Sequence, residues 1–103
     1  MGRFVKVARV GDIPEGQVRE YEVADVSIVI CHTAGRFYAL ANECSHDSAS
    51  FGDGRLVGHE LVCPRHGATF DLRSGAVSGP PAVVGIDRFE LKVEGEDIYV
   101  LVD

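Results

Sequence analysis

Two short pairs of metal-binding side chains stand out in this chain. Cys44 and His46 form the first pair, and Cys63 and His66 form the second. In an extended segment, residues i and i+2 point the same way, so Cys44 and His46 can reach one site from one loop. Cys63 and His66 are three positions apart and can meet over a tight turn, with Pro64 at the second position that a type I turn favours. Thiolate and imidazole both bind metals, so the pattern predicts one metal centre held by four side chains.

Two kinds of centre use such a ligand set. Tetrahedral Zn²⁺ accepts two Cys and two His, although its familiar sites place both Cys in one pair and both His in the other. A [2Fe–2S] cluster in which two His replace two Cys on one iron needs the same four residues. Gly67 follows the second pair, and it either lets backbone pass close to the metal or relaxes the turn. The mixed pairs favour the cluster, with zinc and a chance arrangement of unrelated residues as the alternatives.

Size and charge narrow the class of protein. A length of 103 residues predicts one domain, 1–103, and the net charge of −6 argues against nucleic-acid binding. The first residues lack the apolar stretch of a signal peptide, and no run approaches the ~20 apolar residues of a membrane helix. Three cysteines, of which two belong to the pairs, argue against a disulfide framework, so we expect a cytoplasmic protein without membrane contact.

The rest of the chain carries the pattern of short β-strands. Apolar and polar residues alternate in several stretches, Gly-containing turns separate them, and no stretch shows sustained helical spacing. Val26–Cys31 is apolar on both faces and is expected to be a central strand. The expected strands are Phe4–Val10, Val18–Val23, Val26–Cys31, Arg36–Ala41, 89–93 and 98–101, with hairpin turns at 33–35 and 94–97. The sequence therefore predicts an all-β fold, a small antiparallel sandwich or barrel, with a loop-built insertion over 42–82 that carries both ligand pairs.

The insertion resembles a known family. The sequence from Cys44 to His46 and from Cys63 through Gly67 to Asp71 resembles the Rieske iron–sulfur signature, and Ser74–Ala82 looks like that family's third, proline-containing loop. The resemblance implies the Rieske fold, with a cluster-binding subdomain at about 42–82 and one [2Fe–2S] cluster per chain. It further implies that Cys44 and Cys63 hold the buried iron, and that His46 and His66 hold the outer iron near solvent.

The chain departs from the high-potential members of that family at four positions. Ala49 and Arg65 stand where those proteins have two further cysteines joined by a disulfide. Ala68 and Phe70 stand where those proteins have a Ser and a Tyr hydroxyl that donate hydrogen bonds to the cluster and to a ligand sulfur. Fewer donors stabilise the reduced cluster less, so we expect a potential at the low end of the Rieske range, about −150 mV.

That low potential is typical of the soluble Rieske ferredoxins that serve bacterial aromatic-ring dioxygenases. The resemblance thus implies a ferredoxin that takes single electrons from an NAD(P)H-dependent flavoprotein reductase and passes them to a terminal aromatic-ring-hydroxylating oxygenase. Such a protein catalyses no reaction on a substrate, acts in the catabolism of aromatic hydrocarbons, and is expected to be a monomer. The alternative is the small Rieske-like subunit of an assimilatory nitrite reductase, a branch that often lacks the full ligand set.

The remaining Cys and His residues have plainer interpretations. Cys31 lies in an apolar stretch and is expected to be a small core residue. His32 and His59 are expected at the surface or at strand ends, because a mononuclear oxygenase iron would also need a second domain to arrange its ligands.

Overall fold

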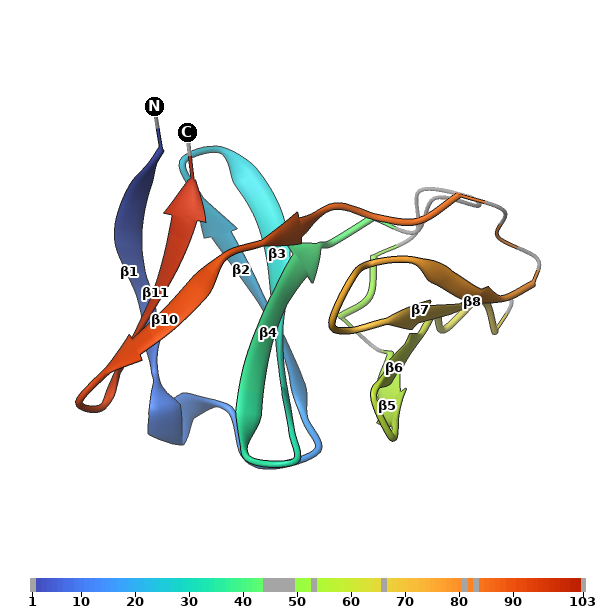
Figure 1. The fold of residues 1–103 in the computed structure, drawn as a ribbon, viewed down its shortest axis with the longest axis horizontal. Coiled ribbons are helices and arrows are strands. Elements are labelled where there is room, and N and C mark those ends of the chain that lie inside the picture. The colour runs from blue at the N-terminus through green and yellow to red at the C-terminus, as the bar shows by residue number, and fades with distance from the viewer. Residues whose placement is uncertain are drawn as a thin grey trace.

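The computed structural model describes residues 2–43, 50–52, 54–65, 67–80, 82 and 84–102. Over these ranges the chain forms three antiparallel sheets and a short 3₁₀ helix at Val10–Asp12. Two sheets build a base, and the third lies beside it in a smaller subdomain (Figure 1). The predicted all-β architecture is confirmed.

The strands of the second and third sheets follow their order in the chain, whereas the first sheet places the last strand of the chain between the first strand and the last but one. The first base sheet has the order β1 (Arg3–Arg9), β11 (Asp97–Val102), β10 (Leu91–Glu94). The second has the order β2 (Val18–Val23), β3 (Val26–Thr33), β4 (Arg36–Ala41), β9 (Arg88–Phe89). The third has the order β5 (Arg55–Val57), β6 (Glu60–Val62), β7 (Thr69–Asp71), β8 (Val77–Gly79).

Strand β3 serves two hydrophobic cores, one on each face. Ile28 and Ile30 belong to the core between the two base sheets. Val29 and Cys31, on the opposite face, belong to the core shared with the third sheet. All four side chains are fully buried, which confirms the prediction of a central strand that is apolar on both faces. The sheet that contains β3 is therefore a common wall between the base and the smaller subdomain.

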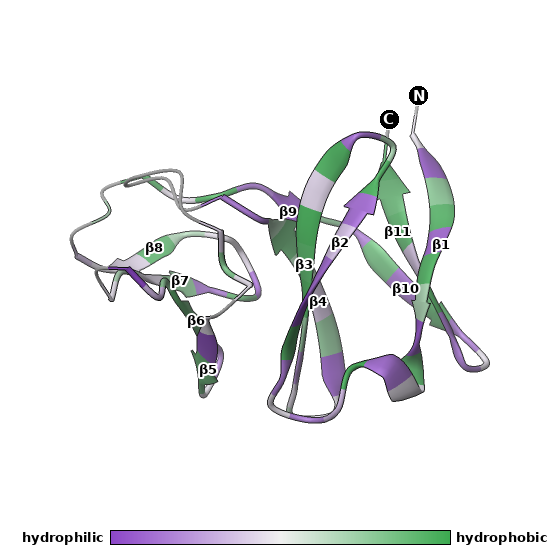
Figure 2. Ribbon diagram, turned by 180° about the vertical axis from the view of Figure 1, so that it is seen from behind, coloured by the Kyte–Doolittle hydropathy of each residue, from purple (hydrophilic) through white to green (hydrophobic). Residues whose placement is uncertain are grey.

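The outer strands of the base show the alternation that a half-buried strand requires. In β10, apolar and charged residues alternate along the strand, as the green and purple segments of Figure 2 show. The turn that joins β10 to β11 confirms the predicted hairpin at 94–97. The single strand expected at 89–93 is wrong, however, because the chain changes sheets at Glu90. Phe89 pairs with Ala39 of β4, whereas Leu91 pairs with Val100 of β11, and both apolar side chains pack against the core between the base sheets.

The segment at 42–82 contains more regular structure than the sequence predicts. Between its loops it forms β5 to β8, a sheet of its own made of strands of three residues each. Strands this short give too few residues to display a period of two, and the Gly and Pro residues around them mask the signal. The segment that contains both predicted ligand pairs thus includes a small sheet.

The turn between β3 and β4 is held by hydrogen bonds to the carboxylate of Glu15, a residue that precedes β2. Ala34 and Gly35 have φ of 52° and 73°, the left-handed values that this tight hairpin requires. The carboxylate of Glu15 accepts hydrogen bonds from the backbone N–H groups of both residues, at 2.7 and 3.1 Å.

His32 lies at the end of β3, as expected, and is part of the base structure. Its Nδ1 lies 2.7 Å from the carbonyl oxygen of Ile13, to which it donates. Its ring stacks on Phe37 with the ring centroids 4.0 Å apart. These contacts account for His32 without a metal.

Candidate metal centre

The second ligand pair begins at a closed turn between β6 and β7. The N–H of Cys63 donates to the carbonyl oxygen of Ala68 at 2.8 Å, and the N–H of Gly67 donates to the carbonyl oxygen of Cys63 at 3.1 Å. The second bond spans one residue more than a type I turn, so the turn is a single helical turn that is not continued. Gly67 has a φ of 78°, and a Cβ placed there would meet open space among the described atoms. Relaxing the turn is therefore the role of this glycine that the geometry supports.

Cys63 lies against an apolar wall. Its exposed fraction is 2%, and its core neighbours Phe51, Ala68 and Phe70 are fully buried. The rings of Phe51 and Phe70 meet edge to face with their centroids 5.6 Å apart. A thiolate in such surroundings needs a compensating positive charge, and a ferric ion supplies one. The chemistry of this side chain therefore fits a cluster ligand.

Cys31 belongs to the same core but has a different character. It is fully buried within β3, and burial raises the pKa of its thiol to about 12. This thiol stays protonated at neutral pH, as expected of a small core residue.

The residues on either side of the first ligand pair are bonded to one another. The side-chain oxygen of Asn42 accepts a hydrogen bond from the backbone N–H of Phe51 at 2.7 Å. The Asn42 side-chain NH₂ donates to the hydroxyl of Ser27 at 3.0 Å, and the Asn42 backbone N–H donates to the Ser27 carbonyl oxygen at the same distance. The chain thus leaves β4 and returns, after 43–49, to the same point of the base.

Glu20 of β2 joins both flanks of that segment. One carboxylate oxygen accepts hydrogen bonds from the Asn42 side-chain NH₂ and from the Ser50 hydroxyl, each at 2.8 Å. These two bonds lower the pKa of the Glu20 carboxyl. Sequence analysis missed Glu20, because it stands in an ordinary alternating strand far from either pair. Asn42 had a local signal, since Asn side chains often bond nearby backbone at the start of a loop.

The third loop is closed at its base by backbone hydrogen bonds. The N–H of Ile86 donates to the carbonyl oxygen of Gly75 at 2.8 Å, and the N–H of Gly75 donates to the carbonyl oxygen of Asp71 at 2.7 Å. Gly75 has a φ of 81°, and a Cβ there would overlap the carbonyl oxygen of Ile86. Only glycine allows the two ends of this loop to approach so closely.

A carboxylate at the start of this loop gives a pH-dependent prediction. Asp71 accepts hydrogen bonds from the backbone N–H and the guanidinium of Arg73, at 2.7 and 3.1 Å. These bonds hold the pKa of Asp71 below its ordinary value of 3.8. The pair therefore stabilises the folded chain above that pH and loses its effect as the pH falls through the folded-state pKa. Replacing Asp71 with Asn should lower the urea midpoint at neutral pH, and the difference from the unmodified protein should narrow towards about pH 3.

The matched control for this measurement is Asp87→Asn, at an exposed position outside the loop turn. A difference between the Asp71 variant and the unmodified protein that stays constant with pH would contradict the assignment.

The structure places one of the four expected ligands. Cys63 is buried at the turn described above, while Cys44, His46 and His66 lie outside the described residues. In the described part of the chain, no three His, Cys, Asp or Glu side chains gather as a metal site. The described residues thus offer no set that competes with the two pairs.

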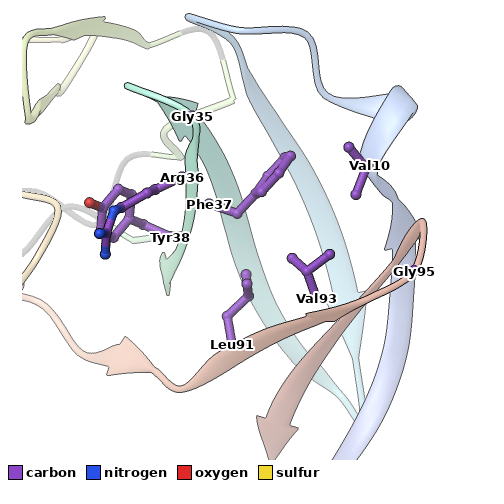
Figure 3. A pocket seen from close by; sticks show the side chains of 8 residues that line it. All are labelled: Val10, Gly35, Arg36, Phe37, Tyr38, Leu91, Val93 and Gly95. Atoms are coloured by element: carbon purple, nitrogen blue, oxygen red, sulfur yellow. The ribbon is translucent and has the colours of Figure 1, made fainter.

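A surface pocket lies on the base, between β4 and β10. It has a volume of about 480 Å³. Figure 3 shows Phe37 from β4 facing Leu91 and Val93 from β10, with Arg36 and Tyr38 on the other side of β4. Cys63 does not line this pocket, so we do not assign the metal centre to it.

Comparisons with known proteins agree on one family. The model of the Rieske [2Fe-2S] domain matches residues 3–101. The chain is 32% identical over 97 residues to the ferredoxin component of biphenyl 2,3-dioxygenase from Rhodococcus jostii (strain RHA1), covering 94% of this chain and 91% of that protein.

Solved structures give the same result. The ferredoxin of carbazole 1,9a-dioxygenase from Nocardioides aromaticivorans IC177 matches with a TM-score of 0.90 and 28% identity, over 94% of this chain and 95% of that chain. A structure described as a complex of reduced oxygenase and oxidized ferredoxin in carbazole 1,9a-dioxygenase matches with a TM-score of 0.87 and 30% identity, over 94% and 91% of the two chains. Among the described residues, no helix has the length and apolar character needed to cross a lipid bilayer.

Proposed function

This chain belongs to the Rieske [2Fe-2S] domain family, and on that premise we propose that it is a ferredoxin that delivers single electrons to a terminal aromatic-ring-hydroxylating oxygenase. The observation that carries the proposal is the buried Cys63 at a closed turn, within a fold that superimposes on a dioxygenase ferredoxin over nearly its whole length. Relatives named as ferredoxin components support electron transfer, with no reaction on a substrate by this chain.

The proposed ligands are the two pairs of the sequence pattern. Cys44 and Cys63 would hold one iron as thiolates, and His46 and His66 would hold the other through imidazole nitrogen. When bound, the cluster accepts and releases one electron at a time. The apolar wall beside Cys63 keeps water from its sulfur.

Ala68 and Phe70 contribute to that wall and offer no hydroxyl group to the cluster or to a ligand sulfur. Their burial supports the prediction of a low potential, which a redox titration would test.

The proposed partners are an NAD(P)H-dependent flavoprotein reductase as donor and the oxygenase as acceptor. A related ferredoxin has been described in complex with its oxygenase, which supports the second partner. The proposal further includes a single domain at 1–103 with a cluster-binding subdomain at about 42–82, a monomeric state and a cytoplasmic location. Contacts between electron-transfer partners are small, below about 1,200 Å², and transient.

Reconstitution with separated components tests the function. The purified protein, a flavoprotein reductase and an aromatic-ring oxygenase should together support NAD(P)H-dependent hydroxylation, and omission of the protein should abolish it. The rate should also fall between low salt and about 0.5 M salt, because charges on the two surfaces assist a transient encounter. Hydroxylation that does not require the protein would contradict the proposal. Stable binding to a large sirohaem-containing subunit instead would favour the nitrite reductase alternative.

A further inference from the structure

Glu20 is an exposed residue of β2 that lies close to the core of the smaller subdomain along the strand. Val18, two positions earlier in β2, belongs to the core that the base shares with the smaller subdomain. Because side chains alternate along a strand, Glu20 lies on the same face, towards the subdomain. The face that packs the metal-bearing half thus ends in a carboxylate at the point where the first ligand segment is attached.

The hydrogen bonds of this carboxylate converge from the two sides of that segment. Asn42 precedes Cys44 and Ser50 follows Ala49, yet their polar groups reach the same oxygen of Glu20. The Ser50 hydroxyl in turn accepts a hydrogen bond from the N–H of Gly52 at 3.0 Å. Hydrogen bonds to an ionised acceptor are about twice as strong as neutral ones, so the charge of Glu20 matters for this contact.

Gly52 provides the space that the carboxylate fills. A Cβ at Gly52 would overlap the carboxylate of Glu20. The backbone of Gly52 does not adopt a positive φ, so an alanine there would meet no backbone strain and would act through the Glu20 side chain. This contact is a second observation, beside the hydrogen bonds, that places the carboxylate against the segment following the first ligand pair.

We propose that Glu20 is a positioning residue for the first ligand pair. Its carboxylate bonds Asn42 and Ser50, which stand on the two sides of the segment that contains Cys44 and His46, and so fixes where that segment leaves and rejoins the base. The inference rests on the proposed function, because it takes Cys44 and His46 as cluster ligands. Without the carboxylate, the Asn42 side-chain oxygen keeps its direct hydrogen bonds from the Phe51 N–H and the Ser50 hydroxyl, and the segment loses its attachment to β2.

Chelator-driven loss of iron from the purified holoprotein tests this role. Cluster absorbance is followed after addition of excess chelator, at a temperature at which far-UV circular dichroism shows the fold to be intact. We expect Glu20→Ala to release iron about tenfold faster than the unmodified protein, and Glu20→Gln, which retains an acceptor oxygen, to lie between them. The electron paramagnetic resonance lines of the reduced Glu20→Ala protein should also shift or broaden, because ligand orientation changes.

Glu15→Ala is the matched control. Glu15 is also an exposed glutamate with two hydrogen bonds to a turn, but it acts at the opposite end of β4. This variant should unfold at a lower temperature and release iron at the unmodified rate. Equal acceleration in the Glu15 and Glu20 variants would mean that general loss of stability opens the site, and would overturn the inference.

A double-mutant cycle tests whether Gly52→Ala changes the rate of iron release through the Glu20 side chain. Gly52→Ala should accelerate iron release in the unmodified background, because it displaces a carboxylate that is still present, and should add nothing in the Glu20→Ala background. Additive effects would overturn the role of Glu20, and so would unmodified release rates in both single variants. A protein that contains no iron and no acid-labile sulfide before any substitution would instead refute the proposed function.

Discussion

Replacing Cys63 with alanine should leave the purified protein without iron or acid-labile sulfide. Its side chain is the described member of the four proposed ligands, and its burial means that no water molecule from bulk solvent can easily take the vacant position. A cluster that needs four protein ligands is not retained on three with an apolar replacement. Metal and sulfide analysis, together with the loss of the visible absorbance, measures the outcome.

Cys31→Ala is the matched control for that experiment. Cys31 is also a buried cysteine, and it belongs to the same hydrophobic core as Cys63. This variant should keep its full content of iron and sulfide and lose only some stability. Retention of the cluster in the Cys63 variant, or its loss in both variants alike, would show that Cys63 has no special role as a ligand.

Replacing Phe70 with alanine should lower the free energy of unfolding by about 3–5 kcal/mol. Phe70 is fully buried between the smaller subdomain and the common wall, and its ring contacts Phe51 edge to face. Truncation to alanine removes the aromatic contact and leaves a cavity beside Cys63 that the surrounding sheets cannot fill. Urea unfolding of the holoprotein at neutral pH provides the measurement.

Phe4→Ala is the corresponding control on the surface. Phe4 is 37% exposed, and the ammonium group of Lys92 lies 4.5 Å from its ring centroid. This variant should lose about 1 kcal/mol, because an exposed cation–π contact contributes little. Similar losses from the two phenylalanine variants would indicate that the core around Phe70 collapses to fill the space.

Much of the fold could be predicted because its strands are long enough to show their pattern. Strands β2 and β4 fall at the predicted residues, and the two-sided apolar character of Val26–Cys31 correctly identified the central strand. The burial of Cys31 was also predictable, since it ends the apolar run of Ile28, Val29 and Ile30. The two pairs of proposed ligands stand out by residue types and spacing alone, and their assignment stays a prediction.

Other features depend on contacts between distant parts of the chain. The third sheet has strands of three residues, too short to show a period. The change of sheet at Glu90 depends on pairing with distant strands, because Phe89 pairs with β4 whereas Leu91 pairs with β11. The attachment of the first ligand segment to Glu20 joins residues more than twenty positions apart, and no local pattern announces it.

The strand that is shared by two cores limits how this protein could be re-engineered. Transplanting the metal-bearing half onto another scaffold would require that scaffold to offer the side chains of Val29 and Cys31 at the receiving surface. A recipient strand with polar residues there would leave the graft with an uncovered apolar underside, prone to aggregation. Evolution within such proteins should therefore preserve the apolar character of this underside, even where it changes exposed residues of the smaller subdomain that bind no metal.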